Sequence, residues 1–192
     1  MTAITLNLNS LIKLTSEQFY LLCEENPELK LERSANGELI VMPPTGGETG
    51  KSNSKFNLQI GLWNEQTGLG EAFDSSTGFT LPNGADRSPD ASWVEKSRWE
   101  ALTTQQREKF IPLCPDFAVE ILSPTDSLKK TQEKMQEYRE NGCRLGWLIN
   151  RKKREVEIYR PGQDVEFLQS PLTLSGENVL PGFVLNLQKI WN

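Results

Sequence analysis

Apolar residues recur at helical spacing in three long stretches of the chain. Residues three or four positions apart lie on one face of a helix, so this spacing predicts amphipathic helices. The first is expected to begin after Thr15, which has Gln18 three residues later as its capping-box partner, and to end at residues 26–27, Asn-Pro. The others are expected over residues 51–66 and 127–141, each with a glycine shortly after its end, and a short surface helix over 99–109.

Shorter apolar runs between these helices predict strands. Residues 29–33 and 38–42 flank an Asn-Gly pair, which is a strong signal for a hairpin. The run FAVEIL at 117–122 is nearly continuous, which is typical of a strand buried on both faces. Because a helix separates it from the apolar run 145–149, the two runs predict a parallel, right-handed β-α-β unit. Further strands are expected at 71–73, 79–81, 91–94, 156–159, 165–168 and 183–187.

This order of elements predicts a mixed α/β (α+β) fold. We expect one domain over residues 1–192, with its core at about 14–191, because a chain of this length commonly forms a single core. Hydrophobic residues make up 36% of the chain and charged residues 24%, which favours a globular protein. No apolar run approaches the roughly 18 residues that a membrane span needs, and no secretory signal is evident, so we expect a cytoplasmic protein without membrane partners.

Two features of the composition restrict the chemistry. The chain has no histidine, which excludes Ser-His and Cys-His catalysis and nearly every common zinc site. The three cysteines are widely spaced, which does not suggest a disulfide framework and favours a reducing compartment. Catalysis would therefore depend on Asp, Glu, Lys, Tyr or Cys.

The net charge of −5 conceals an uneven distribution. Residues 129–154 contain nine basic and three acidic side chains, a local charge of +6, which leaves −11 for the rest of the chain. Lys129 and Lys130 in this segment are candidates for contacts with nucleic-acid phosphates. A solvated helix face followed by a basic turn explains the same charges equally well.

Glu120 is the residue that is hardest to explain structurally, because it lies inside the apolar run FAVEIL. An unpaired ionised carboxylate costs several kcal/mol to bury, so such a group is normally paired, protonated or bound to a metal. Two structural explanations remain open: Glu120 lies at the open end of its strand, or it forms an ion pair with a lysine.

Asp90, just before the strand expected at 91–94, is the candidate partner of Glu120 in a metal site. Asp116 is closer in sequence, but four strand residues place its Cα about 13 Å from that of Glu120, so it is expected at the start of the strand or in a turn. Mg²⁺ typically binds one or two carboxylates together with waters and phosphate oxygens. Asp90, Glu120 and the backbone carbonyl of Ile121 would suffice for Mg²⁺ or Mn²⁺.

Two further residues are candidates for the site. Lys134 lies next to Met135 on the flank of the helix that is expected to face the sheet, so its ammonium could reach Glu120, orient a water molecule and offset charge on a phosphate. Taken alone, a lysine in this position is usually a surface residue. Glu32 lies just before the first hairpin turn and is either a surface strand residue or an extra metal ligand.

These residues belong to a set of motifs with a recognisable order. The motifs are LKLERSANGELIVMPPTGGE, FDSSTGFTLPNGADRSPDASWV, CPDFAVEILSPTD, EKMQEYRENGCRLGWLIN, VEIYRPG and VLPGFVLNLQKIW. Together they resemble the Uma-two family of restriction-endonuclease-like proteins, within the PD-(D/E)XK nuclease superfamily. The resemblance extends from about Leu14 to Trp191, and its specificity comes from the combination of motifs.

The resemblance implies a restriction-endonuclease-like fold, with a central mixed sheet flanked by helices. It implies a catalytic site made by Glu32, Asp90, Glu120 and Lys134, with the metal on Asp90 and Glu120. The parent motif has its lysine two residues after the glutamate, where this chain has Leu122, so Lys134 would take the place of that lysine from the following helix. Thr49 stands where many relatives carry histidine, and no catalytic role is assigned to it.

The leading hypothesis is therefore a Mg²⁺- or Mn²⁺-dependent endonuclease that cuts nucleic acid, with DNA the favoured substrate. A homodimer would suit symmetric cutting of both strands. The alternative is an inactive protein with the nuclease fold that binds nucleic acid or a protein partner. In a third, purely structural interpretation, Glu120 and Lys134 form a buried ion pair with no catalytic role.

Overall fold

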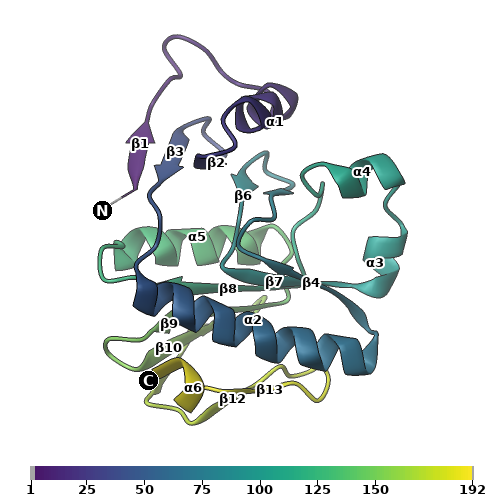
Figure 1. Ribbon diagram of the computed structural model, residues 1–192, viewed down its shortest axis with the longest axis vertical. Helices are drawn as coiled ribbons and strands as arrows, with labels where there is room; N and C mark the ends of the chain where they lie inside the picture. The colour runs from purple at the N-terminus through teal and green to yellow at the C-terminus, as the bar shows by residue number, and fades with distance from the viewer. Residues whose placement is uncertain (1–2, 192) are drawn as a thin grey trace.

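The computed structural model describes residues 3–191, and a six-stranded mixed sheet lies at its centre (Figure 1). Parallel pairing occurs only between β8 and β9 in this sheet, and the other neighbouring strands are antiparallel. The expected β-α-β unit is thus present. The order across the sheet is β11 (Glu166–Gln169), β10 (Glu155–Tyr159), β9 (Leu145–Asn150), β8 (Phe117–Leu122), β7 (Ala91–Glu95) and β4 (Gly70–Asp74).

Two helices cover opposite faces of the central sheet. Alternate side chains of β8 point to opposite faces, so each helix packs against a different set of them. Phe117, Val119 and Ile121 share one apolar cluster with helix α2 (Gly47–Thr67). Ala118 shares a second cluster with helix α5 (Leu128–Glu140). The first face is also packed by the terminal elements, namely β12 (Thr173–Ser175), β13 (Val184–Asn186) and α6 (Gln188–Trp191).

A smaller, five-stranded antiparallel sheet stands beside the central one, in the upper part of Figure 1. Helix α1 (Ser16–Glu25) packs against it through Phe19, which lies in a cluster with Leu31 and Leu39. The buried ion pair between Arg33 and Asp86, 2.8 Å long, joins two of its strands. The strand order is β1 (Ile4–Leu6), β3 (Leu39–Met42), β2 (Lys30–Arg33), β6 (Asp86–Arg87) and β5 (Phe79–Thr80).

Gly146 in β9 allows α5 to lie close to the central sheet. A Cβ atom at this position would come within 2.6 Å of the terminal methyl group of Met135 on α5, which is closer than Cβ atoms tolerate. Met135 and Tyr138 are fully buried on the same helix stripe. The tip of Met135 therefore fills the space beside Gly146, where α5, the helix that carries Lys134, packs over β8 and β9.

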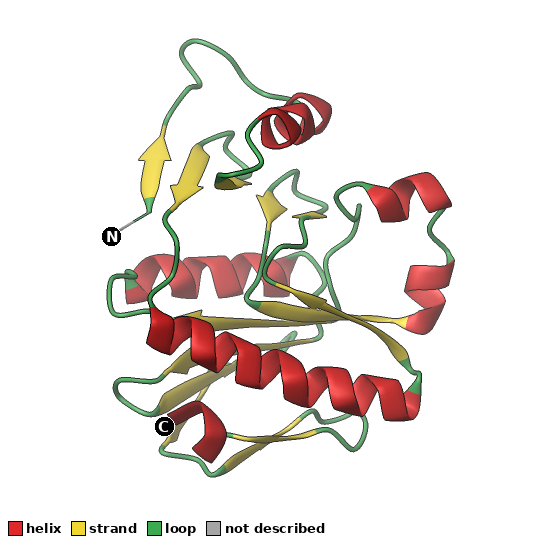
Figure 2. Ribbon diagram, in the orientation of Figure 1, coloured by secondary structure: helices red, strands yellow, loops and turns green. Residues whose placement is uncertain are grey.

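Most expected elements are present, and the differences have local causes (Figure 2). The capping box of Thr15 and Gln18 is formed, and Gly68 ends α2 in a left-handed conformation. The single helix expected over 99–109 is wrong: α3 (Lys96–Glu100) and α4 (Thr104–Glu108) replace it, because Thr103 caps a new helix. Helix α2 begins at Gly47, four residues before the expected start at residue 51.

Four short elements, β1, β6, β12 and α6, were not expected, since two to four residues carry no clear periodicity. None of the helices within residues 3–191 combines the length and the apolar character needed to cross a bilayer.

Candidate active site

The candidate site lies where the two sheets meet under helix α5. Strand β6 of the smaller sheet leads through Ser88 and Pro89 directly to Asp90, which precedes β7 of the central sheet. The backbone N–H of Asp90 donates to the carbonyl of Val119 in β8 at 3.1 Å, and Ala91 pairs with Val119. This short connection places Asp90 beside β8, close to the position of Glu120.

Lys134 is the centre of the site, because its ammonium is shared by two buried carboxylates. Its Nζ lies 2.7 Å from Oε1 of Glu32 and 2.8 Å from Oε1 of Glu120. Glu32 and Glu120 are only 2% and 8% exposed, and the side chain of Lys134 is 13% exposed. The structure thus brings together three of the four residues expected at the site, from β2, β8 and α5.

Tyr138, one helical turn after Lys134, contributes a second contact to Glu120. Its hydroxyl donates to Oε1 of Glu120 at 3.1 Å, and the ammonium of Lys134 lies 5.8 Å from its ring centroid. Both contacts of Glu120 use the same oxygen, Oε1. The carboxylate of Glu120 is therefore anchored from the α5 side through one oxygen.

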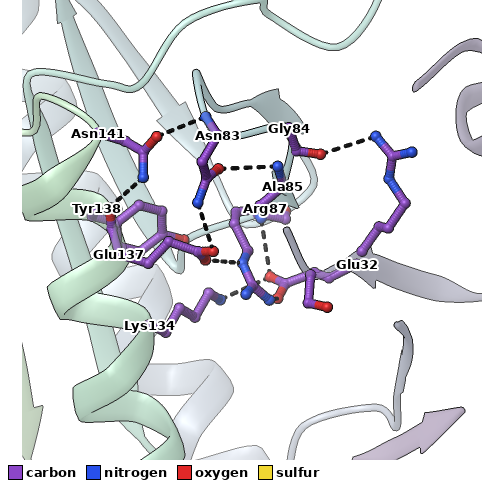
Figure 3. Close-up of polar contacts among 12 residues, drawn as sticks. Glu32, Asn83, Gly84, Ala85, Arg87, Lys134, Glu137, Tyr138 and Asn141 are labelled. Carbon is purple, nitrogen blue, oxygen red and sulfur yellow. Dashed lines mark hydrogen bonds and ion pairs between the residues drawn. The ribbon is translucent and has the colours of Figure 1, made fainter. Parts of the chain in front are cut away.

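Arg87 is a site residue that the sequence did not reveal. Figure 3 shows its guanidinium between the carboxylates of Glu32 and Glu137. Its Nη1 lies 3.2 Å from Glu32 Oε2, and its Nε lies 2.6 Å from Glu137 Oε2. The N–H of Ser88 also donates to Glu32, at 3.0 Å. With Lys134, these groups engage both oxygens of Glu32 and hold its carboxylate in one orientation.

Asp90 differs from the other carboxylates, because both of its oxygens accept from uncharged donors. The side-chain amide of Asn53 on α2 donates to Oδ1, and the backbone N–H of Ile121 donates to Oδ2, both at 2.8 Å. Asp90 is only partly buried. In a strand, the N–H and the C=O of one residue point to the same side. The carbonyl of Ile121 therefore faces the edge of β8 on which Asp90 lies, away from β9.

The pKa values of the two buried glutamates beside Lys134 are shifted in opposite directions. Burial alone would raise the pKa of Glu32, but Lys134 and Arg87 lower it to about 2. Burial raises the pKa of Glu120 to about 7. Lys134 opposes this rise, whereas the charges of Asp90 and Glu32 add to it. Glu32 is thus ionised at neutral pH, whereas Glu120 titrates there.

Lys134 and Asp90 are also perturbed. Burial opposes the charge of Lys134, but Glu120 and Glu32 raise its pKa above the ordinary lysine range, so it stays protonated. Burial raises the pKa of Asp90, while the N–H of Ile121 and nearby lysines limit the shift. Perturbed carboxylates around a buried lysine are typical of catalytic sites, although structural ion-pair networks produce them too.

Asp116 lies outside this site, as its distance along β8 predicted. It is 1% exposed, immediately before β8, and accepts from the backbone N–H of Glu95 at 2.9 Å. Arg98 and Arg144 lie 2.9 and 3.6 Å from its Oδ1. Asp116 therefore ties the start of β8 to the end of β7 and to two surface arginines.

Three other residues singled out in the sequence do not contact the carboxylate cluster. Lys129 and Lys130 are exposed in the first turn of α5, on the helix that carries Lys134. Thr49 is buried in the first turn of α2. The expected phosphate contacts of the two lysines remain a prediction.

The oxygen atoms near Asp90 include too few carboxylates to hold a hard divalent cation by themselves. Within residues 3–191, no three Asp, Glu, Cys or His side chains converge closely enough to hold a metal ion by themselves. Asp90 and Glu120 supply two carboxylates, and Ile121 adds a carbonyl on the same side. Mg²⁺ commonly uses one or two carboxylates and fills its other positions with water, so these oxygen donors are compatible with it.

Comparison with known proteins identifies the family of this chain. A family model described as "Putative restriction endonuclease" matches residues 16–188 and so spans β2, β8 and α5 with all four candidate residues. The chain belongs to the Uma2 family. Membership of Uma2 confirms the resemblance inferred from the motifs of the sequence.

A solved structure supports the fold of this Uma2 protein. It comes from Anabaena variabilis ATCC 29413 and is described as a putative nuclease belonging to DUF820. It shares 23% sequence identity and a TM-score of 0.77, and the match covers 93% of this chain and 97% of that chain. At this identity the likeness establishes the fold, the mixed α/β architecture expected from the sequence. The comparison with curated proteins gave no match.

Proposed function

We propose that this Uma2 protein is a divalent-metal-dependent endonuclease that hydrolyses phosphodiester bonds in DNA. The observation that carries the proposal is the sharing of one buried lysine by two buried carboxylates beside Asp90, whose own carboxylate contacts only neutral donors. The family description, restriction endonuclease, supports nucleic acid as the substrate class and DNA in particular.

The charge of the cluster supports a divalent ion. Three carboxylates, those of Glu32, Glu120 and Glu137, contact two cations, Lys134 and Arg87, and Asp90 lies nearby as a fourth carboxylate. When all six groups are ionised, the cluster carries −2, the charge that Mg²⁺ or Mn²⁺ would balance. A purely structural ion-pair network would have no need of Asp90 beside Glu120, because each added carboxylate disfavours ionisation of the other.

Asp90, Glu120 and the carbonyl of Ile121 are the groups that would hold the ion. All three are oxygen donors, which Mg²⁺ and Mn²⁺ prefer. A bound ion would polarise the scissile phosphate and lower the pKa of a coordinated water. Oε2 of Glu120 is the oxygen suited to this contact, since Lys134 and Tyr138 both bind Oε1.

Lys134 acts in this proposal as a fixed positive charge. Because it stays protonated, it orients the attacking water and offsets negative charge that develops on the phosphate, without serving as a base. Glu32 acts as a positioning residue. Its oxygens are engaged by Lys134, Arg87 and the N–H of Ser88, which favours this role over direct metal binding.

The second candidate function is a nuclease-fold protein that binds nucleic acid or a protein without cutting. It is favoured by Leu122, which stands where the parent motif has lysine, and by the net charge of −5. A protein of this kind would bind DNA equally well with metal or with EDTA.

The proposal includes an assembly and a location. We expect a homodimer, because a two-fold pair of sites cuts both strands of a duplex symmetrically, and light scattering of the purified protein would test this. We place the protein in the cytoplasm, where DNA is accessible, and its three widely spaced cysteines suit a reducing compartment. Cell fractionation tests the location.

A cleavage assay tests the main proposal. Plasmid DNA, single-stranded DNA and RNA would each be incubated with Mg²⁺, Mn²⁺ or EDTA, using the wild type, Asp90→Asn and Glu120→Gln. Asp116→Asn is the matched control, because it makes the same change at a buried aspartate outside the site. Metal-dependent cutting of DNA that is lost in the first two variants and kept in the control is expected. Undiminished cutting by Asp90→Asn, or no cutting of any substrate, would contradict the proposal.

A further inference from the structure

Asn53 on α2 carries a polar atom that the proposed mechanism does not use. Its Oδ1 is buried and has no hydrogen-bond partner within residues 3–191, while its Nδ2 donates to Oδ1 of Asp90. Buried amide oxygens are normally paired, because an unpaired one loses its hydrogen bonds to water. Because Oδ1 has no hydrogen bond to lose, the amide of Asn53 can turn its oxygen toward Asp90 when a cation binds there.

The distance between the two side chains fits two neighbouring ligands of one ion. Asn53 Nδ2 and Asp90 Oδ1 are 2.8 Å apart. In an octahedral Mg²⁺ site with metal–oxygen distances of about 2.1 Å, adjacent oxygens lie about 3 Å apart. A half turn about the Cβ–Cγ bond of Asn53 exchanges its amide nitrogen and oxygen. After that turn, an oxygen stands next to Asp90 Oδ1 at the spacing that the ion requires.

Asn53 also explains how the carboxylate of Asp90 is stabilised when no metal ion is bound. With the ion absent, the amide N–H compensates the carboxylate of Asp90, which no charged group contacts directly. With the ion present, the carboxylate no longer needs that donor. The side-chain amide of Asn57, one turn later, donates to the backbone carbonyls of Asn53 and Asp90 and so holds this part of α2 against β7.

We propose that Asn53 is a metal ligand, whose side-chain oxygen joins Asp90, Glu120 and the carbonyl of Ile121 around the divalent ion. The inference rests on the proposed function, since it requires an ion at Asp90. It adds a neutral ligand from α2 to a site whose carboxylates come from the segment before β7 and from β8. The amide turns from donor to ligand when the ion binds.

Three substitutions separate a ligand from a residue that only positions Asp90. Asn53→Ala removes both amide atoms, whereas Asn53→Asp keeps an oxygen ligand and removes the donor. Ser54→Asp places the same added charge on the next, exposed residue of α2 and controls for simple electrostatic attraction. The measurement is the affinity of each protein for Mn²⁺ at pH 8 without substrate. Binding is detected as a decrease in the electron paramagnetic resonance signal of free Mn²⁺.

We expect Asn53→Ala to weaken Mn²⁺ binding about tenfold. Asn53→Asp should bind at least as tightly as wild type and more tightly than Ser54→Asp. Equal weakening by Asn53→Ala and Asn53→Asp would overturn the inference and identify Asn53 as a donor alone. Unchanged binding by Asn53→Ala, with binding lost in Asp90→Asn, would overturn the inference and leave the proposed function standing. A wild type that binds no Mn²⁺ would overturn both.

Discussion

The ammonium of Lys134 lies 2.8 Å from the carboxylate of Glu120, although the two side chains come from different elements, α5 and β8. In the parent motif implied by the family resemblance, both residues stand on one strand. Here the helix that follows the strand supplies the positive charge. The contact with Glu32 then ties the same lysine to the smaller sheet.

Moving the lysine back to the strand tests whether the position of the charge is what matters. Lys134→Met should abolish cleavage, because no cation remains beside Glu120. Leu122 points to the same face of β8 as Glu120 and is only partly buried. Adding Leu122→Lys to Lys134→Met should therefore restore part of the activity, measured as the rate of plasmid cleavage. The double variant Leu122→Met, Lys134→Met is the control and should stay inactive.

Metal binding should depend on pH through Glu120. Its pKa of about 7 means that a proton competes with the ion at and below neutral pH. Between pH 7 and pH 5, we expect Mn²⁺ affinity to fall about tenfold per pH unit, and above pH 8 to level off. The raised pKa of Asp90 would steepen the fall at the acidic end. Isothermal titration calorimetry across this pH range measures the Mn²⁺ affinity. An affinity of the wild type that does not change with pH would contradict the assignment of Glu120 as a metal ligand.

Arg87 should be a stabilising residue as well as a positioning one. Arg87→Met leaves Glu32 and Glu137 without the cation between them, and removal of one partner of a buried ion pair costs about 3–5 kcal/mol. Urea unfolding at pH 7 measures the loss. Once Arg87 is absent, replacing Glu137 removes no ion pair. The double variant Arg87→Met, Glu137→Gln should therefore lose less free energy of unfolding than the sum of the losses in the two single variants. Additive effects would show that the three residues do not act as one network.

Lys129 and Lys130 should affect DNA affinity without affecting chemistry. Each phosphate contact contributes about −0.9 to the slope of log affinity against log salt, so replacing both with glutamine should reduce the slope by up to about 2. Fluorescence anisotropy with a DNA duplex in Ca²⁺ buffer measures this. Lys152→Gln with Lys153→Gln, in the exposed turn before β10, is the control pair. An unchanged slope in the α5 variant would assign these lysines to a solvated helix face.

The spacing of apolar residues was sufficient to predict β8 and α5, which carry Glu120 and Lys134. The run FAVEIL predicted a buried strand, and β8 has that position. Met135 and Tyr138 predicted the buried stripe of α5, and Lys134 lies close enough to that stripe to reach Glu120. The charge pattern was also informative, because a carboxylate within an apolar run requires a partner.

Arg87 and Asn53 could not be predicted in the same way. Arg87 acts through β6, a strand of two residues that carries no periodic signal, and its partners lie on β2 and α5. Asn53 lies within a predicted helix and carries no signal of its own in the sequence, and only its contact with Asp90 shows what it faces. Both depend on how distant segments meet, which the order of residues in the chain does not reveal.

The cluster draws Glu32 from the smaller sheet and Glu120 from the central one. In the proposed mechanism, the site is therefore a property of the docked pair of sheets and belongs to neither sheet alone. A partly unfolded molecule in which the smaller sheet has separated would retain Asp90 and Glu120 but lose the carboxylate that steadies Lys134. A chain still emerging during synthesis would also lack a complete cluster, because Glu120 and Lys134 are made long after Glu32. Under the proposed function, we therefore expect cleavage of nucleic acid only from molecules whose fold is complete.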